Sequence, residues 1–348
     1  MHYIRRMENK IAEMYRMRLI NGFCHLYAGQ VSSKQSNHFF LSEIFDPSYF
    51  TVNDFSKRKE KEAVAIGCKV ALKDNDNVIT AYRCHAFAFL FGGTARSVMA
   101  ELMGRKTGIS KGKGGSMHMY APKFYGGEGI VGGQVPIGTG LAFAHKYNGT
   151  DAVSVSLYGD GASSQGQIYE VWNMAKLWNL PAIYICENNQ YAMGTQLHRH
   201  SANTKFYTRG DLIPGIKVNG MRVIDVREAI TFARDYAIRN GPIILEVDTY
   251  RYYGHSMSDP GVGYRTRDEI KSVQSEQDPI LLFTKLLVDN GLKTQNEADE
   301  IRKEIYKEVD AEAELAKADP WPELTEITEA VYAKPIGKCR FKVPWENI

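Results

Sequence analysis

Asp160 and Asn189 are the two residues whose types and surroundings most clearly predict chemistry. Asp160 stands between Gly159 and Gly161, which allow a turn that a side chain would obstruct. Asn189 is the second of two adjacent asparagines further along the chain. A carboxylate, an amide oxygen and nearby backbone carbonyls suit a hard cation such as Mg²⁺, which prefers oxygen ligands and often shares its shell with phosphates. The Gly-Asp-Gly turn alone is a weak signal, since a loop with a capping aspartate has the same pattern, so the prediction depends on its pairing with the asparagines.

Three segments predict how these two residues come together. Residues 152–158 alternate apolar and small polar side chains and are rich in valine, which is typical of a β-strand. Residues 165–178 carry apolar side chains at helical spacing, and residues 182–186 form a second short apolar strand. A strand, a helix and a strand in this order form a parallel crossover unit. Asp160 and Asn189 are therefore expected at the same edge of the sheet.

Strands and helices alternate along most of the remaining chain, which predicts an α/β fold with a doubly wound, mostly parallel sheet. A basic, glycine-rich stretch at 106–115 suits an anion, although a mobile solvated loop is the commoner explanation of such a composition. The expected strands are 78–82, 221–226 and 242–250, and the expected helices are 7–21, 95–103, 136–147 and 227–239, followed by charged helices from 278 onward with a break at Asn290 and Gly291.

The composition is that of an ordinary globular protein. Hydrophobic residues make up 44% of the 348 residues and charged residues 24%. The net charge of +3 is too small to indicate a nucleic-acid or membrane-surface partner. Five cysteines, an odd number without metal-like spacing, are interpreted as reduced residues. Glu8 and Glu13 would be absent from a mitochondrial presequence, so the first residues are interpreted as a helix of the folded body.

Residues 31–61 interrupt the pattern. They are polar, aromatic and charged in patches and show no sustained period, which is unusual for a loop inside a compact domain. An unspliced intron in the gene model is one interpretation and a genuine lineage insertion is the other, and in either case we expect poor order. The predicted regions are a helical segment at 1–30, this insertion at 31–61, an α/β domain at 62–275 and a helical region with a tail at 276–348.

Several blocks together resemble one family, the alpha subunits of the pyruvate dehydrogenase component of mitochondrial-type complexes. The resemblance runs nearly from end to end outside 31–61, and it implies a thiamin diphosphate-binding fold with a helical C-terminal extension. The blocks that carry it are 22–26, Tyr82-Arg83, 112–118, 126–131, Gly159-Asp160-Gly161, Glu187-Asn188-Asn189 and 252–264.

The resemblance implies that this chain binds the diphosphate half of thiamin diphosphate together with Mg²⁺. In the family, the alpha chain supplies the metal ligands and most diphosphate contacts. Carried over residue by residue, the metal ligands would be Asp160, Asn189 and the carbonyl of Tyr191, and the diphosphate contacts would be Tyr82, Arg83 and His255. The aminopyrimidine would lie against Gly129 and Val131, and further cofactor contacts would come from Ala121, Gly161 and Ala162. The catalytic residues would be His25 and His255.

The implied reaction is the decarboxylation of pyruvate with reductive acetylation of a lipoyl group. The implied partners are a beta subunit, in a tetramer of two alpha and two beta chains, and the lipoyl domain of the acetyltransferase component. The family's activating glutamate belongs to the beta chain, so this chain alone is expected to be inactive. The resemblance also implies the mitochondrial matrix as the location.

A regulatory kinase and phosphatase are implied as well. Of the family's three regulatory serines, one matches Ser256, whereas Gly263 and Gln196 stand at the other two positions. We therefore expect phosphorylation at a single site, where a dianion would disturb the loop that must order around the cofactor.

The chain departs from the sequence pattern of the family at three places, and two alternative functions remain open. Ser164 stands where the family usually has asparagine, Cys84-His85-Ala86 replaces a small-His-Gly pattern, and Tyr253 replaces a histidine. One alternative is the same chemistry on a branched-chain 2-oxo acid or on acetoin. The other is a non-catalytic paralogue that only scaffolds the beta subunit, although the presence of both Asp160 and Asn189 argues against it.

Overall fold

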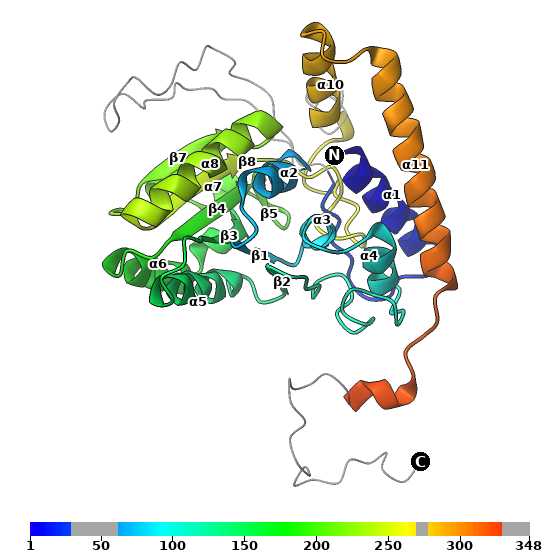
Figure 1. Ribbon diagram of the computed structural model, residues 1–348, viewed down its shortest axis with the longest axis horizontal. Helices are drawn as coiled ribbons and strands as arrows, with labels where there is room; N and C mark the ends of the chain where they lie inside the picture. Colours follow the sequence, from blue (N-terminus) through cyan, green and yellow to red (C-terminus); the bar gives the residue numbers. More distant parts are fainter. Residues whose placement is uncertain (29–61, 269–277, 329–348) are drawn as a thin grey trace.

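The computed structural model describes residues 1–28, 62–268 and 278–328 of the chain (Figure 1). The segment 31–61, interpreted above as an insertion, lies outside the described residues, and so do parts of the other predicted regions. The division of the chain into four regions therefore stays a prediction.

A six-stranded sheet forms the centre of the fold, in the order β2-β1-β3-β4-β8-β7, and every neighbouring pair in it is parallel. This confirms the predicted α/β fold with a doubly wound parallel sheet. A separate two-stranded antiparallel hairpin joins β5 and β6. The strands are β1 (Asn77–Ala81), β2 (Phe124–Glu128), β3 (Ser154–Gly159), β4 (Ala182–Asn188), β5 (Tyr191–Ala192), β6 (Thr195–Gln196), β7 (Gly215–Asn219) and β8 (Ile243–Asp248).

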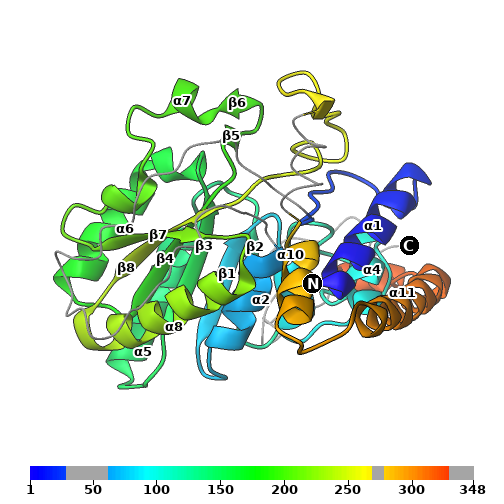
Figure 2. The same cartoon turned by 90° about the horizontal axis from the view of Figure 1, so that it is seen from above.

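Helices cover both faces of this sheet, α5 and α6 on one face and α2 and α8 on the other (Figure 1). The long helix α11 runs beside α1 and α4 at one side of the sheet (Figure 2). The helices are α1 (His2–Arg16), α2 (Glu62–Ala71), α3 (His85–Leu90), α4 (Ala95–Leu102), α5 (Gln134–Tyr147), α6 (Gly166–Leu177), α7 (Leu197–His200), α8 (Val223–Asn240), α10 (Pro279–Asp289) and α11 (Gln295–Ala318), and the 3₁₀ turn η2 spans Ala162–Ser164.

Strand β4 shows why the sheet needs cover on both faces. Ile183 and Ile185 pack into one hydrophobic cluster, whereas Tyr184 and Cys186 pack into another. Successive side chains of a strand point to opposite faces, so a strand that is apolar throughout must be buried on both. The apolar composition of 182–186 therefore places β4 in the interior of a parallel sheet.

The strand predicted at 221–226 is wrong. The strand is β7, which ends at Asn219, and the Asn219 side chain accepts a hydrogen bond from the backbone N–H of Met221 at 3.2 Å. Val226 and Ile230 are buried with helical spacing and belong to α8, which begins at Val223. The β-branched residues suggested a strand, but burial of one helical face against the sheet outweighs their weak intrinsic preference.

The first helix was predicted at 7–21 and runs instead from His2 to Arg16. The chain leaves the helix where Arg18 takes a positive φ of 60°. Within the described residues, the remaining predicted helices and strands are confirmed with small shifts of their ends, and the predicted break at Asn290 and Gly291 separates α10 from α11. Helix α10 is mostly apolar, so the prediction of charged helices from 278 onward is wrong for this element.

The interpretation of the cysteines can be compared with the described residues. Cys24, Cys68, Cys84 and Cys186 are free and buried there, in agreement with their interpretation as reduced core residues. None of the helices described is both long enough and apolar enough to cross a bilayer.

Helix α5 approaches the sheet closely at Gly138. A Cβ atom at Gly138 would lie 1.9 Å from Oγ of Ser156 on β3 and 2.9 Å from Cγ2 of Ile79 on β1. Gly140, two residues later in the same helix, has no such neighbour within 4 Å. The close packing of α5 against β3, which carries the Asp160 turn, therefore depends on one of these glycines and not on the other.

We expect Gly138→Ala to lower the free energy of unfolding by about 1–3 kcal/mol, since the added methyl group overpacks the contact with β3. Gly140→Ala is the matched control and should be neutral or raise it by about 0.5–1 kcal/mol, because alanine is the better helix former. Denaturant unfolding of both variants measures this. Equal stability of the two would contradict the packing described here.

Candidate functional site

The site lies at the carboxyl edge of the sheet, where several parallel strands end together. Asp160 follows β3 and Asn189 follows β4, and these strands pair so that Gly159 lies opposite Glu187. Strand β1 ends directly before Tyr82, and Ala81 lies opposite Glu128, the last residue of β2. The edge therefore collects the turn residues that the sequence singled out.

Asp160 and Asn189 are neighbours, as predicted. The backbone N–H of Asn189 donates to Oδ1 of Asp160 at 3.3 Å, and both residues are buried. Within the described residues, neither Oδ2 of Asp160 nor Oδ1 of Asn189 has a hydrogen-bond partner. Leaving two buried acceptor oxygens unpaired costs free energy, so the pair fits a cation that would satisfy both.

A cation at this site would also need ligands other than His, Cys, Asp and Glu side chains. In the described parts of the chain, no three or more His, Cys, Asp or Glu side chains gather in a way that could hold a metal ion. A Mg²⁺ ion here would therefore combine the carboxylate of Asp160 with oxygens from an amide, from a backbone carbonyl and from its ligand. Mg²⁺ is commonly bound in this way, through one or two carboxylates together with the phosphates of a substrate.

Tyr191, the third predicted ligand, is buried at the start of β5, two residues after Asn189. Its ring contacts Tyr250 and Tyr264, with centroid separations of 6.3 and 5.5 Å. Gln190, the residue between Asn189 and Tyr191, has a positive φ of 70°, so the backbone turns sharply there. These contacts fix the segment, while the role of the Tyr191 carbonyl as a ligand stays a prediction.

A second group of predicted residues gathers around Tyr82. The rings of His25 and Tyr82 lie 4.6 Å apart between centroids, and those of His25 and His255 lie 5.2 Å apart. Arg83 donates through Nη1 to the carbonyl of Leu26 at 2.9 Å and through Nη2 to the carbonyl of His255. Arg83 therefore joins three distant segments of the chain, and each Nη atom keeps a second N–H for a ligand.

Charge in this group is positive and buried. Burial and the charge of Arg83 lower the pKa of His25 to about 3, and burial with Arg83 and Arg251 lowers the pKa of His255 to about 4. Burial and the charge of Arg83 also lower the pKa of Arg251 to about 10. At neutral pH both imidazoles are therefore uncharged and both guanidinium groups are charged, an arrangement that attracts an anion such as a diphosphate.

Arg251, Asp259 and Tyr264 are part of the site, although no pattern in the sequence assigned them a role. Arg251 Nη2 donates to the carbonyl of Met193 at 2.6 Å and to the hydroxyl of Tyr264 at 2.8 Å, and Nη1 lies 3.4 Å from Nδ1 of His255. Tyr264 donates in turn to Oδ2 of Asp259 at 2.6 Å, which also accepts from the backbone N–H of His255 at 2.6 Å. This network connects the β5–β6 hairpin, which begins two residues after Asn189, to the loop that carries His255.

Of the remaining predicted cofactor contacts, four lie at the carboxyl edge of the sheet and one does not. Gly129 and Val131 follow β2 at the carboxyl edge, where the carbonyl of Val131 accepts from Gln167 at 3.3 Å. Gly161 and Ala162 lie at the start of η2, directly after Asp160. Ala121 bridges to Phe124 at the amino end of β2, so the length of that strand separates it from the other residues.

The glycine-rich stretch at 106–115 binds an anion that belongs to the chain itself. Glu101 is buried, and its Oε2 accepts from the backbone N–H groups of Ser110 and Gly112 at 2.7 and 2.8 Å. Its Oε1 accepts from those of Gly114 and Gly115 at 2.6 and 3.2 Å. The backbone donors of this loop are therefore occupied by a structural carboxylate.

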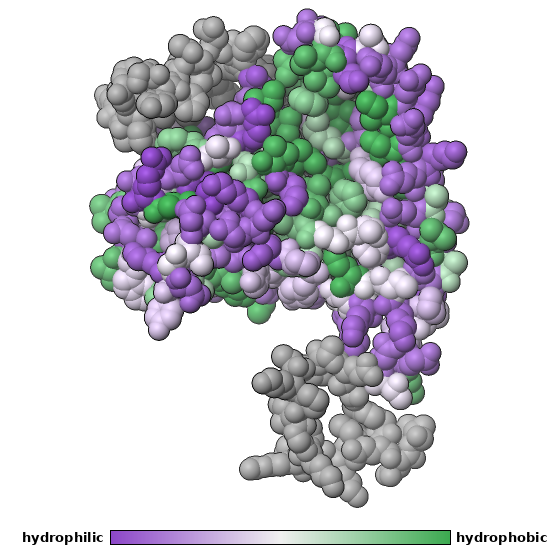
Figure 3. Space-filling model, in the orientation of Figure 1, coloured by the Kyte–Doolittle hydropathy of each residue, from purple (hydrophilic) through white to green (hydrophobic). Residues whose placement is uncertain are grey.

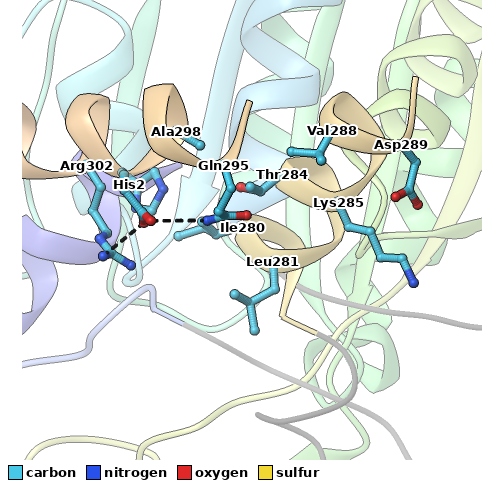
Figure 4. Close-up of a pocket in the computed structure, with 11 residues that line it drawn as sticks. His2, Ile280, Leu281, Thr284, Lys285, Val288, Asp289, Gln295, Ala298 and Arg302 are labelled. Atoms are coloured by element: carbon cyan, nitrogen blue, oxygen red, sulfur yellow. Dashed lines mark hydrogen bonds and ion pairs between the residues drawn. The ribbon is translucent and has the colours of Figure 1, made fainter. Parts of the chain in front are cut away.

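A cavity of about 180 Å³ lies between α10 and α11, away from the sheet edge (Figure 4). Asp299 there accepts from Gln295 at 3.4 Å and pairs with Arg302 at 3.0 Å, so these three side chains satisfy one another. The exposed Leu281 and Leu286 make the adjoining surface of α10 apolar (Figure 3). None of the predicted site residues lines this cavity.

The two lowered histidine pKa values predict a pH dependence of stability. An unfolded imidazole titrates near pH 6.5, so below that pH the unfolded chain binds protons that the folded site does not bind until the pH approaches 4. The free energy of unfolding should therefore fall between pH 6.5 and pH 4, and His255→Asn should make this fall shallower. Denaturant midpoints at several pH values measure the slope, with the exposed His198→Asn as the control. Equal slopes for the two variants would contradict the assignment.

Comparison with known proteins gives the family. The model of the dehydrogenase E1 component family matches residues 55–325. The mitochondrial alpha subunit of the pyruvate dehydrogenase E1 component from Homo sapiens, somatic form, is 48% identical over 334 residues, which are 96% of this chain and 78% of the human protein. The corresponding proteins of Saccharomyces cerevisiae and Sminthopsis macroura are 49% and 48% identical and cover 95% and 96% of this chain, which amounts to 72% and 84% of their own lengths.

Both the family match and the identities extend over most of the chain, and the geometry at the sheet edge agrees with them. The chain therefore belongs to the dehydrogenase E1 component family, as an alpha subunit of the mitochondrial pyruvate dehydrogenase type.

Proposed function

We propose that this alpha subunit binds the Mg²⁺-diphosphate half of thiamin diphosphate at the carboxyl edge of its sheet, and that with a beta subunit it decarboxylates pyruvate and acetylates a lipoyl group. The observation that carries the proposal is the pair of buried, unpartnered oxygens on Asp160 and Asn189, in the part of the chain that the structure describes. Such a pair, beside buried arginines, suits a cation that an anionic ligand shares.

Each group of residues has a distinct task in this proposal. Asp160, Asn189 and the carbonyl of Tyr191 hold the ion, and Tyr82, Arg83 and His255 hold the diphosphate. Thiamin diphosphate, when bound, supplies the ring that accepts the electrons released with carbon dioxide. Gly129 and Val131 orient the other ring, with Gly161 and Ala162 as further contacts, and Ala121 is the contact that the geometry supports least.

His25 and His255 act as uncharged groups. Their pKa values of about 3 and 4 keep both imidazoles neutral at pH 7, so each can donate one hydrogen bond and accept another without bringing a charge to the reacting end. Asp259 holds the backbone of His255, and Arg251 lies beside its ring. The loop therefore fixes the position of His255 before a ligand arrives.

An exposed apolar surface supports a beta partner. Phe143 on α5 contacts Tyr147 and Trp178, with ring centroids 6.2 and 5.7 Å apart, and all three are exposed. Ile137 on α5 is 46% exposed, and Leu177 at the end of α6 is 70% exposed. Apolar groups gathered on one surface indicate a protein interface. We infer that a beta subunit covers α5 and α6 in a tetramer of two alpha and two beta chains.

The names of the relatives support the location, and the other partners are part of the same proposal. The similar proteins from human and yeast are named as mitochondrial, which supports a matrix location for this chain. Transfer to the lipoyl domain of an acetyltransferase component and control by a kinase and phosphatase belong to the same proposal.

Removal of the carboxylate tests the cation site. We expect Asp160→Ala, assembled with a beta subunit, to weaken thiamin diphosphate binding in the presence of Mg²⁺ by at least about 100-fold, since the ion loses its charged ligand. Calorimetry measures binding, and pyruvate-dependent acetylation of a lipoyl domain measures activity. Asp235→Asn, on the exposed side of α8, is the control. Unchanged binding in Asp160→Ala would overturn the site.

The same assembly separates the alternatives. A branched-chain 2-oxo acid turned over faster than pyruvate would favour the branched-chain relatives. A complex with the beta subunit that binds no thiamin diphosphate would favour the non-catalytic scaffold.

Ser256 is the proposed phosphorylation site. It is 7% exposed, and its neighbour Met257 donates through its backbone N–H to the carbonyl of Cys24 at 2.9 Å. A kinase must therefore displace this segment to reach the hydroxyl, and a dianion there would prevent its return beside His255.

We expect Ser256→Asp to lower the rate of lipoyl acetylation by about 100-fold, since displacement of His255 by about 1 Å is enough for such a loss. Ser256→Ala should stay active and resist inactivation by the cognate kinase. The measurement is activity before and after kinase treatment, with the exposed Ser258→Ala as the control. If Ser256→Ala is still switched off, the single-site proposal fails.

A further inference from the structure

His200 places an imidazole nitrogen at the same cation site. It is the last residue of α7, in the loop that follows the β5–β6 hairpin. Its Nε2 lies 3.5 Å from Oδ2 of Asp160, the carboxylate oxygen that faces the proposed ion. The side chain of His200 is 15% exposed and that of Asp160 is 1% exposed, so the contact is largely shielded from water.

The contact between His200 and Asp160 is not a hydrogen bond. Among the described residues, Nε2 of His200 and Oδ2 of Asp160 both lack a hydrogen-bond partner, and so does Oδ1 of Asn189. Three unpartnered polar atoms thus belong to residues that contact one another at one turn. Adjacent ligands of an octahedral ion with bonds near 2.1 Å are about 3 Å apart. A shift of about 0.5 Å would therefore bring Nε2 and Oδ2 to the separation of two ligands of one ion.

The other ring nitrogen is already held. Nδ1 of His200 lies 3.0 Å from Oγ of Ser201, and the backbone N–H of Ser201 donates to the carbonyl of Leu197 at 3.0 Å. Donation from Nδ1–H to that hydroxyl leaves the lone pair of Nε2 directed at the carboxylate. Histidines that bind metals are commonly oriented in this way, by a hydrogen bond from the second nitrogen.

We propose that His200 is a nitrogen ligand of the ion bound by Asp160 and Asn189, and that the site therefore favours a later first-row divalent metal such as Fe²⁺, Co²⁺ or Ni²⁺ over Mg²⁺. Mg²⁺ prefers oxygen ligands, whereas imidazole binds the later metals more strongly. This inference rests on the proposed cation site and departs from the Mg²⁺ proposed above only in the ion that the site prefers, because an imidazole ligand does not fit the all-oxygen shell of Mg²⁺.

The test uses the full chain assembled with its beta subunit, in the presence of thiamin diphosphate. Calorimetry with Co²⁺ and with Mg²⁺ gives the two affinities, and pulsed electron paramagnetic resonance of bound Mn²⁺ detects a coordinated imidazole nitrogen. We expect the wild-type complex to show the ¹⁴N coupling and to bind Co²⁺ more tightly than Mg²⁺. His200→Ala should lose the coupling and weaken Co²⁺ binding by about tenfold or more, with Mg²⁺ binding changed less than about threefold.

His198→Ala is the matched control, since His198 is a histidine of the same short helix but is exposed. It should leave the coupling and both affinities unchanged. Mn²⁺ bound without ¹⁴N coupling, or His200→Ala binding every ion as tightly as the wild type or more tightly, would overturn the inference, because His200 would then only occupy the place of the ion. These results would leave the cation site intact, whereas Asp160→Ala that still binds metal would contradict the site itself.

Discussion

The parallel pairing of β3 with β4 is the constraint on which the site depends. It places Gly159 beside Glu187, and so the two turns that follow present Asp160 and Asn189 to each other at one edge. A slip of one residue would turn every side chain of a strand to the opposite face. Because β4 is buried on both faces, with Ile183 and Tyr184 in different clusters, such a slip would move each side chain into the wrong core.

The buried charged groups at the same edge explain why it suits an anionic ligand. Arg83 and Arg251 are buried and cationic, while His25 and His255 are neutral. Arg83 uses its donors on two backbone carbonyls, so its position does not depend on a ligand. A site with two fixed guanidinium groups and an unsatisfied carboxylate is complementary to an anion that brings its own cation, as a diphosphate with a divalent metal does.

Loops far apart in the chain complete the edge, and buried polar groups hold them in place. Glu101 organises the glycine-rich loop through four backbone N–H groups, two on each carboxylate oxygen. Arg251 and Tyr264 join the hairpin segment at Met193 to the loop that holds His255 and Ser256. A change at Ser256 therefore acts on the ligand site through a small number of identified hydrogen bonds.

The sequence by itself determined the order of most elements and the meeting of Asp160 with Asn189, because a strand-helix-strand unit is a local pattern and its handedness and direction follow from short-range geometry. It failed at 221–226, where burial against the sheet outweighed β-branched preference. Only the tertiary structure revealed the network of Arg251, Asp259 and Tyr264, the internal carboxylate of Glu101 and the approach of His200 to Asp160. These contacts join loop residues whose types follow no period, so their partners are set by how the turns pack and not by any pattern along the chain.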